Sequence, residues 1–273
     1  MDAKSKQPII DELRVTYGDI LPEHEYLIDH DWEWFRRRHK INAYVFSQKT
    51  SLSRKMKALL TAVATAARMP GSEGGRYVRM HVRHALELGA TPQEILEAFE
   101  CITFPVGGIA FMVGVKCLWD ILEEEPHLKT NEVSESSSAE VRKAPLTRKA
   151  LEEKQLKVHG YVLPEHEFIM DNDWDWTLLM HDFYDYTNTR EGGLPNKMRS
   201  LVVVVALCAR IPGIEGERYI RNHMGLALKA GAKPEEILEA LECAYFPCGG
   251  PTLLVGVKCL REVIQEGEAG RGA

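Results

Sequence analysis

The sequence lacks the segments that would carry a protein across or into a membrane. Its first residues, MDAKSKQPIIDELRV, contain no apolar stretch of the kind that marks a secretory signal. The longest apolar run, LVVVVALCA at 201–209, falls well short of the about 20 residues that a membrane-spanning helix needs. We therefore expect a cytoplasmic protein with no membrane partner.

An excess of basic residues is also absent. Lysine and arginine together number 34, against 40 aspartates and glutamates, and the formal net charge is -6. Proteins that bind nucleic acid usually present clustered positive charge. Hydrophobic residues make up 45% of the chain, which is too many for a disordered protein. These values predict a globular protein with no nucleic-acid partner.

Paired cysteine motifs are missing as well. None of the six cysteines forms a Cys-x-x-Cys motif with another. Because the chain also shows no export signal, we expect reduced thiols and no framework of disulfides.

The most prominent feature that is present is a long internal repeat. HVRHALELGATPQEILEAFEC at 81–101 returns as HMGLALKAGAKPEEILEALEC at 223–243, and 223 minus 81 gives an offset of 142. This offset holds without a gap over 18–122, so that 160–264 is the second copy. A period this long exceeds the units of solenoid proteins and indicates a tandem duplication of one domain.

The segment between the two copies has the composition of a linker. Residues 123–149 combine an acidic start, a serine cluster and two prolines, which is typical of a solvated connection. We therefore predict a first domain at 1–122, a linker at 123–149 and a second domain at 150–273.

Each copy shows helical periodicity. In residues 52–71 the apolar side chains recur at helical spacing, and a Pro-Gly pair ends the run. Gly89 is expected to end the next helix in the left-handed conformation. Thr91 and Pro92 have the residue types of a cap and a first helical position. No segment shows the alternation of a strand, so the predicted fold is all-α.

Three motifs taken together resemble a known family. In the second copy they are LPNKMRSL at 194–201, the histidine helix with its GAKPEEILEA turn, and FPCGGP at 246–251. In this order they are similar to the carboxymuconolactone decarboxylase family of the alkylhydroperoxidase-like superfamily, over nearly all of each copy. The resemblance implies two tandem alkylhydroperoxidase-like helical domains and a role in the breakdown of aromatic compounds. It also implies a homo-oligomer, which we expect to be a trimer of two-domain chains.

One branch of the superfamily reduces peroxides with a Cys-x-x-Cys motif, whose second cysteine lies four residues before the histidine, and with an assisting glutamate. Such chemistry requires an accessible thiolate. In this chain the corresponding places hold neither thiols nor carboxylates: Gly74, Tyr77 and Ala62 in the first copy, and Gly216, Tyr219 and Val204 in the second. The missing groups argue against a thiol peroxidase.

The namesake branch decarboxylates small lactone acids without a metal or an organic cofactor, and the resemblance implies this lyase activity here. The chemistry needs a cation or donors for the carboxylate, a donor for the enolate-like charge, and an acid. His81 and His223 match the family histidine, and histidine titrates near neutrality. We take these two histidines, with Glu97 and Glu239, as the candidate catalytic residues, and we expect no cofactor.

The candidate substrate is a small-molecule carboxylate. Tyrosines four residues before each histidine share its helix face. Nearby arginines can hold a carboxylate by two parallel hydrogen bonds. The candidate substrate-binding residues are Arg76, Tyr77, Arg79, Arg218, Tyr219, Arg221, Cys248, His24 and His166.

Each candidate also has a purely structural explanation. A histidine on a mostly apolar helix is often a core residue bonded to the main chain. The arginines can be solvated or paired with Glu73 and Glu215, three residues before Arg76 and Arg218. Structural ion pairing explains the two candidate catalytic glutamates equally well.

A metal site has no local signature. The chain contains no His-x-x-x-His pair, and His81 with His84 has no second-copy equivalent because Leu226 replaces the second histidine. We therefore predict no metal, although a site assembled from distant segments stays open.

The two copies differ at the loop that ends the third motif. FPCGGP in the second copy keeps a Cys-Gly pair and a following proline, whereas the first copy has Val106 and Ile109 at these places. We expect the second copy to carry the more family-like site, completed by residues of the first copy or of a neighbouring chain. The alternatives are a hydrolase or isomerase acting on another small acid, and a non-catalytic ligand-binding oligomer.

Overall fold

The protein is helical throughout the part of the chain that its computed structural model describes. The described residues are 3–17, 20–69, 72–129, 146–159, 161–162, 164–190, 192–210 and 213–269. No strand forms among them, which confirms the predicted all-α fold. Of the helices within these ranges, none has both the length and the apolar character that crossing a bilayer requires.

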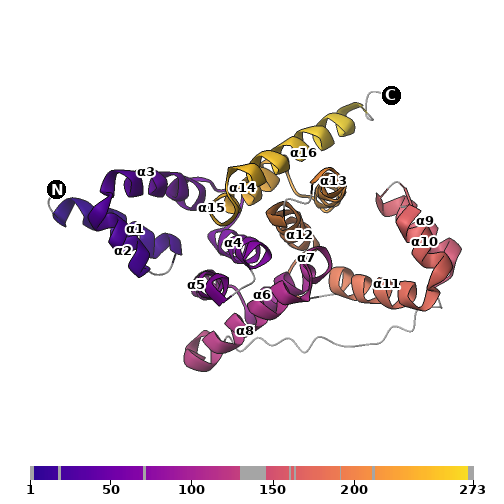
Figure 1. Ribbon diagram of the computed structural model, residues 1–273, viewed down its shortest axis with the longest axis horizontal. Coiled ribbons are helices and arrows are strands. Elements are labelled where there is room, and N and C mark those ends of the chain that lie inside the picture. The colour runs from indigo at the N-terminus through magenta and orange to yellow at the C-terminus, as the bar shows by residue number, and fades with distance from the viewer. Residues whose placement is uncertain are drawn as a thin grey trace. The chain divides into compact units, whose positions relative to one another are not determined.

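The helices belong to two compact units. The main unit comprises Met1–Glu132 and Gly193–Ala273, and the second unit comprises Val133–Gly192 (Figure 1). The main unit thus contains parts of both repeats. The predicted boundaries at 122 and 150 describe the repeat of the sequence and stay a prediction for the folding units, and residues 130–145 of the predicted linker lie outside the described residues.

The first repeat supplies the first group of helices of the main unit. They are α1 (Ala3–Tyr17), α2 (Pro22–His30), α3 (Trp32–Ala43), the π-helical turn η1 (Tyr44–Gln48), α4 (Arg54–Arg68), α5 (Ser72–Glu87), α6 (Pro92–Cys101), α7 (Thr103–Val106), α8 (Gly108–Glu124) and the 3-10 turn η2 (Pro126–Leu128).

The second repeat is divided between the two units. The described helices of the second unit are α9 (Arg148–His159), which precedes the copy at 160–264, and two helices of that copy, α10 (Pro164–Asn172) and α11 (Trp174–Thr189). The others belong to the main unit: α12 (Asn196–Arg210), α13 (Gly213–Lys229), α14 (Pro234–Cys243), α15 (Tyr245–Cys248) and α16 (Gly250–Ala269).

Local signals set several helix ends where the sequence predicts them. Thr91 Oγ1 accepts a hydrogen bond from the main-chain N–H of Glu94 at 3.1 Å, and the Glu94 carboxylate accepts one from the Thr91 N–H at 2.9 Å. This reciprocal capping box begins α6. Gly89 after α5 and Gly107 before α8 have φ of +88° and +93°, conformations that residues with a Cβ rarely adopt. The predicted left-handed helix end at Gly89 is confirmed.

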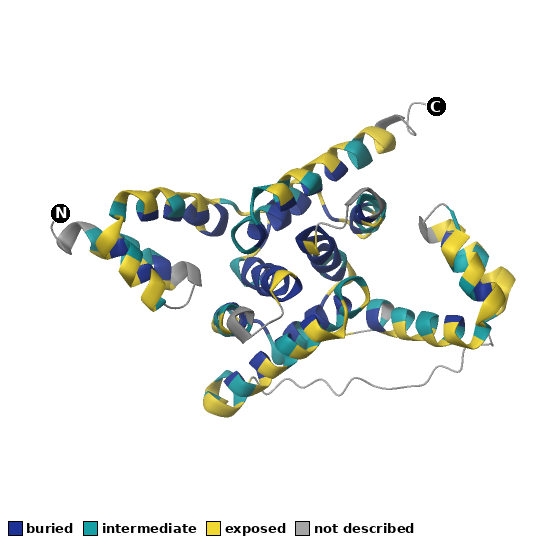
Figure 2. Cartoon of the chain, in the orientation of Figure 1, coloured by how far each residue is buried: buried dark blue, intermediate teal, exposed yellow. Residues whose placement is uncertain are grey.

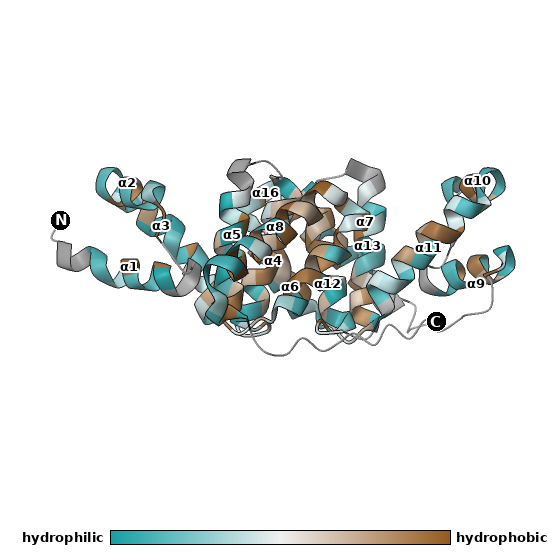
Figure 3. Cartoon of the chain, turned by 90° about the horizontal axis from the view of Figure 1, so that it is seen from below, coloured by the Kyte–Doolittle hydropathy of each residue, from teal (hydrophilic) through white to brown (hydrophobic). Residues whose placement is uncertain are grey.

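The core of the main unit lies around α4 and α12, which occupy equivalent positions in the two repeats and pack against each other. Most residues of both helices are buried (Figure 2), and apolar residues gather on these central helices (Figure 3). One continuous cluster of buried residues, which runs from Val45 to Ile121 and from Leu194 to Leu260, includes side chains of both repeats. Each repeat therefore completes the core of the other.

Helices α1, α2 and α3 form a smaller layer beside α5. Leu13, Ile28 and Phe35 make a separate buried cluster, and Met80 of α5 packs against it. This packing places α2 and α3 next to the helix that carries His81.

Candidate active site

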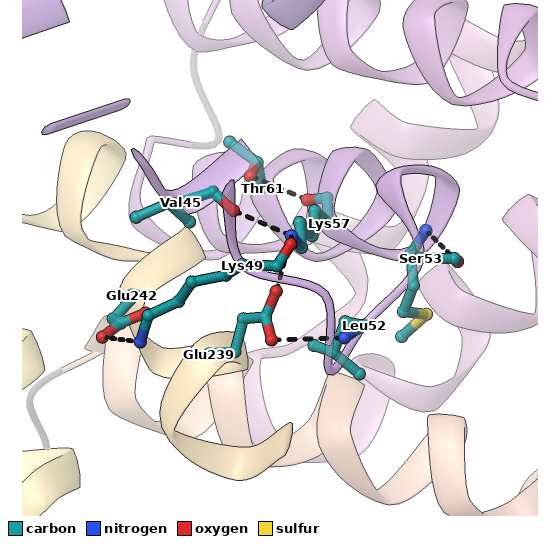
Figure 4. Close-up of polar contacts among 9 residues, drawn as sticks. Val45, Lys49, Leu52, Ser53, Lys57, Thr61, Glu239 and Glu242 are labelled. Atoms are coloured by element: carbon teal, nitrogen blue, oxygen red, sulfur yellow. Dashed lines mark hydrogen bonds and ion pairs between the residues drawn. The ribbon is translucent and has the colours of Figure 1, made fainter. Parts of the chain in front are cut away.

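A buried ion pair joins the two repeats. Lys57 Nζ on α4 lies 2.5 Å from Glu239 Oε1 on α14, and the side chains are 0% and 1% exposed (Figure 4). The ammonium also donates to the main-chain carbonyls of Val45 at 2.8 Å and Lys49 at 2.5 Å. Glu239 Oε2 accepts the main-chain N–H of Leu52 at 3.2 Å. Such bonds offset part of the cost of burying two charges.

A second buried ion pair joins the repeats with the roles exchanged. Here the cation comes from the second repeat and the carboxylate from the first. Arg199, at the position that matches Lys57, donates from Nη2 to Glu97 Oε2 at 2.8 Å. The Glu97 carboxylate also accepts the main-chain N–H groups of Gly193 at 3.1 Å and Leu194 at 2.8 Å. Leu194 matches Leu52, so the two ion pairs and their main-chain bonds are reciprocal.

Both candidate catalytic glutamates therefore sit in structural ion pairs, which is the alternative that sequence reasoning left open. The cations that hold them were not among the predicted site residues. Lys57 and Arg199 stand at matching positions inside strongly apolar helices, in KMKALL and KMRSLV. A cation inside a strongly apolar helix indicates a buried anionic partner, because burying an unpaired charge costs much free energy.

Three histidines gather on the first-repeat side of the main unit. His24 on α2, with His81 and His84 on α5, are all buried. Burial, together with the nearby His84 and His24, lowers the pKa of His81 from 6.5 to about 3. Burial and the guanidinium of Arg38 lower the pKa of His24 to about 4. Both imidazoles are therefore neutral at physiological pH.

His223, the second-repeat counterpart of His81, is half-buried on α13. The two histidines thus differ in access to water, although their sequence positions match. Leu226 stands at the place of His84 in the second repeat, so His223 has no counterpart of the histidine that helps to lower the pKa of His81.

The predicted substrate-binding arginines largely engage acidic residues. Arg76 Nη2 donates to Glu23 at 2.8 Å, and its guanidinium lies 5.1 Å from the ring centre of Tyr77. Arg79 and Arg221 form ion pairs at 2.5 and 3.0 Å, with Glu124 and Glu262. Arg218 stacks over the ring of Tyr219 at 5.7 Å. The predicted pairing with Glu73 and Glu215 falls on side chains outside the described residues.

The cysteines, including the predicted substrate-binding Cys248, are all buried. Burial raises the pKa of Cys248 to about 12 and that of Cys259 to about 11. The pKa values of Cys208 and Cys243 are raised further for the same reason. These thiols stay protonated at neutral pH, which fits poorly with a thiolate mechanism.

The two LPEHE histidines have different surroundings. His24 lies in the main unit near His81. His166 lies in the second unit, where its Nδ1 is 3.3 Å from Gln155 Nε2, and the same amide nitrogen is 3.4 Å from His181 Nε2. Gln155 on α9, His166 on α10 and His181 on α11 all belong to the second unit, so this polar contact lies within that unit.

No metal centre is formed by these groups. Among the described residues, no three histidine, cysteine, aspartate or glutamate side chains are placed to bind one ion together.

Comparison with known proteins decides the family. The model of the carboxymuconolactone decarboxylase family matches residues 33–118 and 173–262, which together make up more than half of the chain. The chain belongs to the carboxymuconolactone decarboxylase family. The double match confirms the resemblance stated from the sequence motifs and agrees with a tandem duplication.

A solved structure has the fold of this family member. It is a protein of Burkholderia xenovorans that is provisionally named a gamma-carboxymuconolactone decarboxylase subunit. The TM-score is 0.61, the sequence identity is 23%, and the alignment covers 98% of each chain. At this identity the likeness shows the fold and no more. No curated protein matches the chain at a significant level.

Proposed function

We propose that the protein is a decarboxylase-like lyase that acts on a small lactone or a related carboxylic acid by acid-base chemistry without a cofactor. Family membership supports the reaction class. The observation that carries the proposal is the gathering of His24, His81 and His84, because His24 and His84 lie near enough to His81 to lower its pKa.

Buried neutral imidazoles suit one part of this reaction. Loss of carbon dioxide leaves negative charge on an enolate-like oxygen, and a fixed N–H donor stabilises that charge without itself being ionised. Because the pKa of His81 is about 3, this residue serves as such a donor at neutral pH and does not serve as the acid.

Proton delivery then falls to a group that water reaches. His223 is half-buried, unlike His81, and it lies in the repeat with the family-like FPCGGP loop. We assign the acid role at the second-repeat site to His223. Glu97 and Glu239, already held by buried cations, act in this proposal by positioning the helices.

The test is release of carbon dioxide from 4-carboxymuconolactone and related lactone acids by the full chain. His223→Gln is expected to lower kcat by about 100-fold or more, since a positioned acid contributes about that much. His127→Gln is the matched control, because His127 is exposed on η2. Turnover by His223→Gln equal to that of the parent would remove His223 as the acid.

The same assay separates the alternatives. Conversion of a lactone acid without loss of carbon dioxide would identify a hydrolase or an isomerase. Binding of such acids without any conversion would identify a ligand-binding protein and would contradict the lyase proposal.

We also propose that the chain forms a homo-oligomer, with a trimer as the expected state. Large apolar side chains on α8 and α16 are exposed, and such surfaces on a folded protein often mark interfaces. They include Ile109, Met112, Trp119 and Leu254. Light scattering coupled to size-exclusion chromatography tests this state, and a monomer at micromolar concentration would contradict it.

A further inference from the structure

Arg38 on α3 differs from the arginines beside it. Arg36 and Arg37 both form ion pairs with Glu33, at 2.8 Å each. Arg38 is half-buried, and it makes no ion pair with any acidic side chain that the structure describes. A guanidinium held partly out of water without a carboxylate leaves strong hydrogen-bond donors available to a ligand.

The surroundings of Arg38 come from both repeats. Its guanidinium carbon lies 5.2 Å from the ring centre of Phe246 on α15, which follows α14 in the main unit (Figure 1). Tyr245 meets Phe246 edge to face at 5.2 Å. The charge of Arg38 also lowers the pKa of the buried His24. Arg38 therefore lies near both Phe246 of the FPCGGP segment and His24.

The contact with Phe246 leaves the N–H groups of Arg38 able to bind an anion. A cation-π contact uses the face of the guanidinium plane or its charge, whereas the N–H bonds lie in that plane. Two parallel N–H donors match the two oxygens of a carboxylate. An aromatic neighbour also reduces competition from water, which strengthens such a pair.

Three of the four arginines predicted from sequence to hold the carboxylate are less suited to this role. Arg76, Arg79 and Arg221 already bind Glu23, Glu124 and Glu262. A substrate carboxylate would have to displace each of these partners.

We propose that Arg38 binds the carboxylate of the substrate, in a site that α3 of the first repeat and α15 of the second repeat build together. This inference rests on the proposed function and names its carboxylate-binding residue. The matching position in the second repeat is Met180. The chain therefore has one site of this kind and not two.

The experiment compares a charged ligand with its neutral analogue on the full chain. The probes are 5-oxotetrahydrofuran-2-carboxylate, a small lactone acid, and its methyl ester. Isothermal titration calorimetry of Arg38→Gln should give binding of the acid that is about 10- to 100-fold weaker than in the parent, because charge-assisted hydrogen bonds are lost. Binding of the ester should be weak and equal in both proteins.

Arg37→Gln is the matched control on the same helix, since Arg37 is 73% exposed. It should bind the acid as the parent does. Arg38→Lys keeps the charge but not the paired donors, so its affinity should fall between those of the parent and Arg38→Gln. Equal affinity of Arg38→Gln and the parent, an equal loss in Arg37→Gln, or no binding of the acid by the parent would each overturn the proposal.

A second readout reports the location of the anion. In NMR titrations of the histidine ring signals, the acid should raise the pKa of His24 in the parent, because an added negative charge favours the protonated ring. Arg38→Gln should raise the pKa of His24 without any ligand and abolish the response to the acid. An unchanged His24 signal on saturation with the acid would contradict the assigned site.

The outcomes for this site and for the lyase proposal are separable. Binding of the acid through Arg38 without release of carbon dioxide would support the site and contradict the lyase. Decarboxylation that is unaffected in Arg38→Gln would support the lyase and contradict the site.

Discussion

Glu97 and Glu239 occupy the same position in the two repeats, and each binds a buried cation of the other repeat. The carboxylate of one repeat is thus part of the core of the other. Neither half of the main unit has a complete set of partners for its buried charges without the other half. This reciprocity gives a physical reason for the two copies to remain in one chain.

Removal of one partner of the Lys57–Glu239 pair should be costly. Lys57→Met is expected to lower the free energy of unfolding by about 3–5 kcal/mol, because Glu239 is left as an unpaired buried charge. Urea denaturation followed by circular dichroism measures this loss.

Lys55→Met provides the control, because Lys55 on the same helix pairs with Glu94 at 2.8 Å and is 35% exposed. Its substitution should cost about 1 kcal/mol or less. The double variant Lys57→Met with Glu239→Gln should lose less than the sum of its single changes. Additive losses would show that the two side chains do not interact.

Acid should destabilise the main unit through its buried histidines. The pKa values of His24 and His81 are lowered from 6.5 to about 4 and about 3, so the unfolded chain takes up these protons first. Their contribution to stability is present above pH 6.5 and is lost as the pH falls toward those lower values. Each histidine adds a limiting slope of about 1.4 kcal/mol per pH unit.

The window between pH 6.5 and 5 isolates this effect, because most carboxyl groups remain ionised there. Urea denaturation across this window should show a steady loss of stability, and His81→Asn should reduce its slope. A stability profile of the parent that stays level from pH 7 to 5 would contradict the burial of both rings.

Gly114 on α8 allows close packing against α6. A Cβ at this position would lie 2.2 Å from Cδ1 of the buried Phe99 ring. Gly114→Ala should therefore lower the free energy of unfolding by about 1–3 kcal/mol, since the rigid ring must shift.

The control is Gly225→Ala on α13, where a Cβ meets no atom within 4 Å. This change should stabilise the protein by about 0.5–1 kcal/mol, because alanine is the better helix former. Thermal unfolding of the two variants should thus move in opposite directions, and a shift of the same sign in both would argue against the close α6–α8 contact.

The thiols should be unreactive in the folded protein. All six are buried, and burial raises the pKa of Cys248 to about 12. Reaction with an aromatic disulfide reagent at pH 7 should be slow in buffer and complete for six thiols in guanidinium chloride. Fast labelling of one thiol in the native protein would reopen a thiol mechanism.

Much of the fold follows from the order of residues along the chain. The offset of 142 predicts the duplication, and helical spacing with caps such as Thr91 and breaks such as Gly89 predicts the helices. These features depend on neighbours within a few residues, and for that reason they can be predicted locally. The family motifs can also be read directly from the sequence, and the match of the family model confirms the resemblance that they indicate.

Only the tertiary structure decided which side chains meet. Nothing near Glu97 and Glu239 in the sequence indicates that Arg199 and Lys57 are their partners. His81 and His223 occupy matching positions, yet one is buried among histidines and the other is half-buried. Such differences arise from contacts between segments more than 100 residues apart, as in Glu97 with Arg199. Burial and charge pairing are properties of that packing, and the one-dimensional pattern does not contain them.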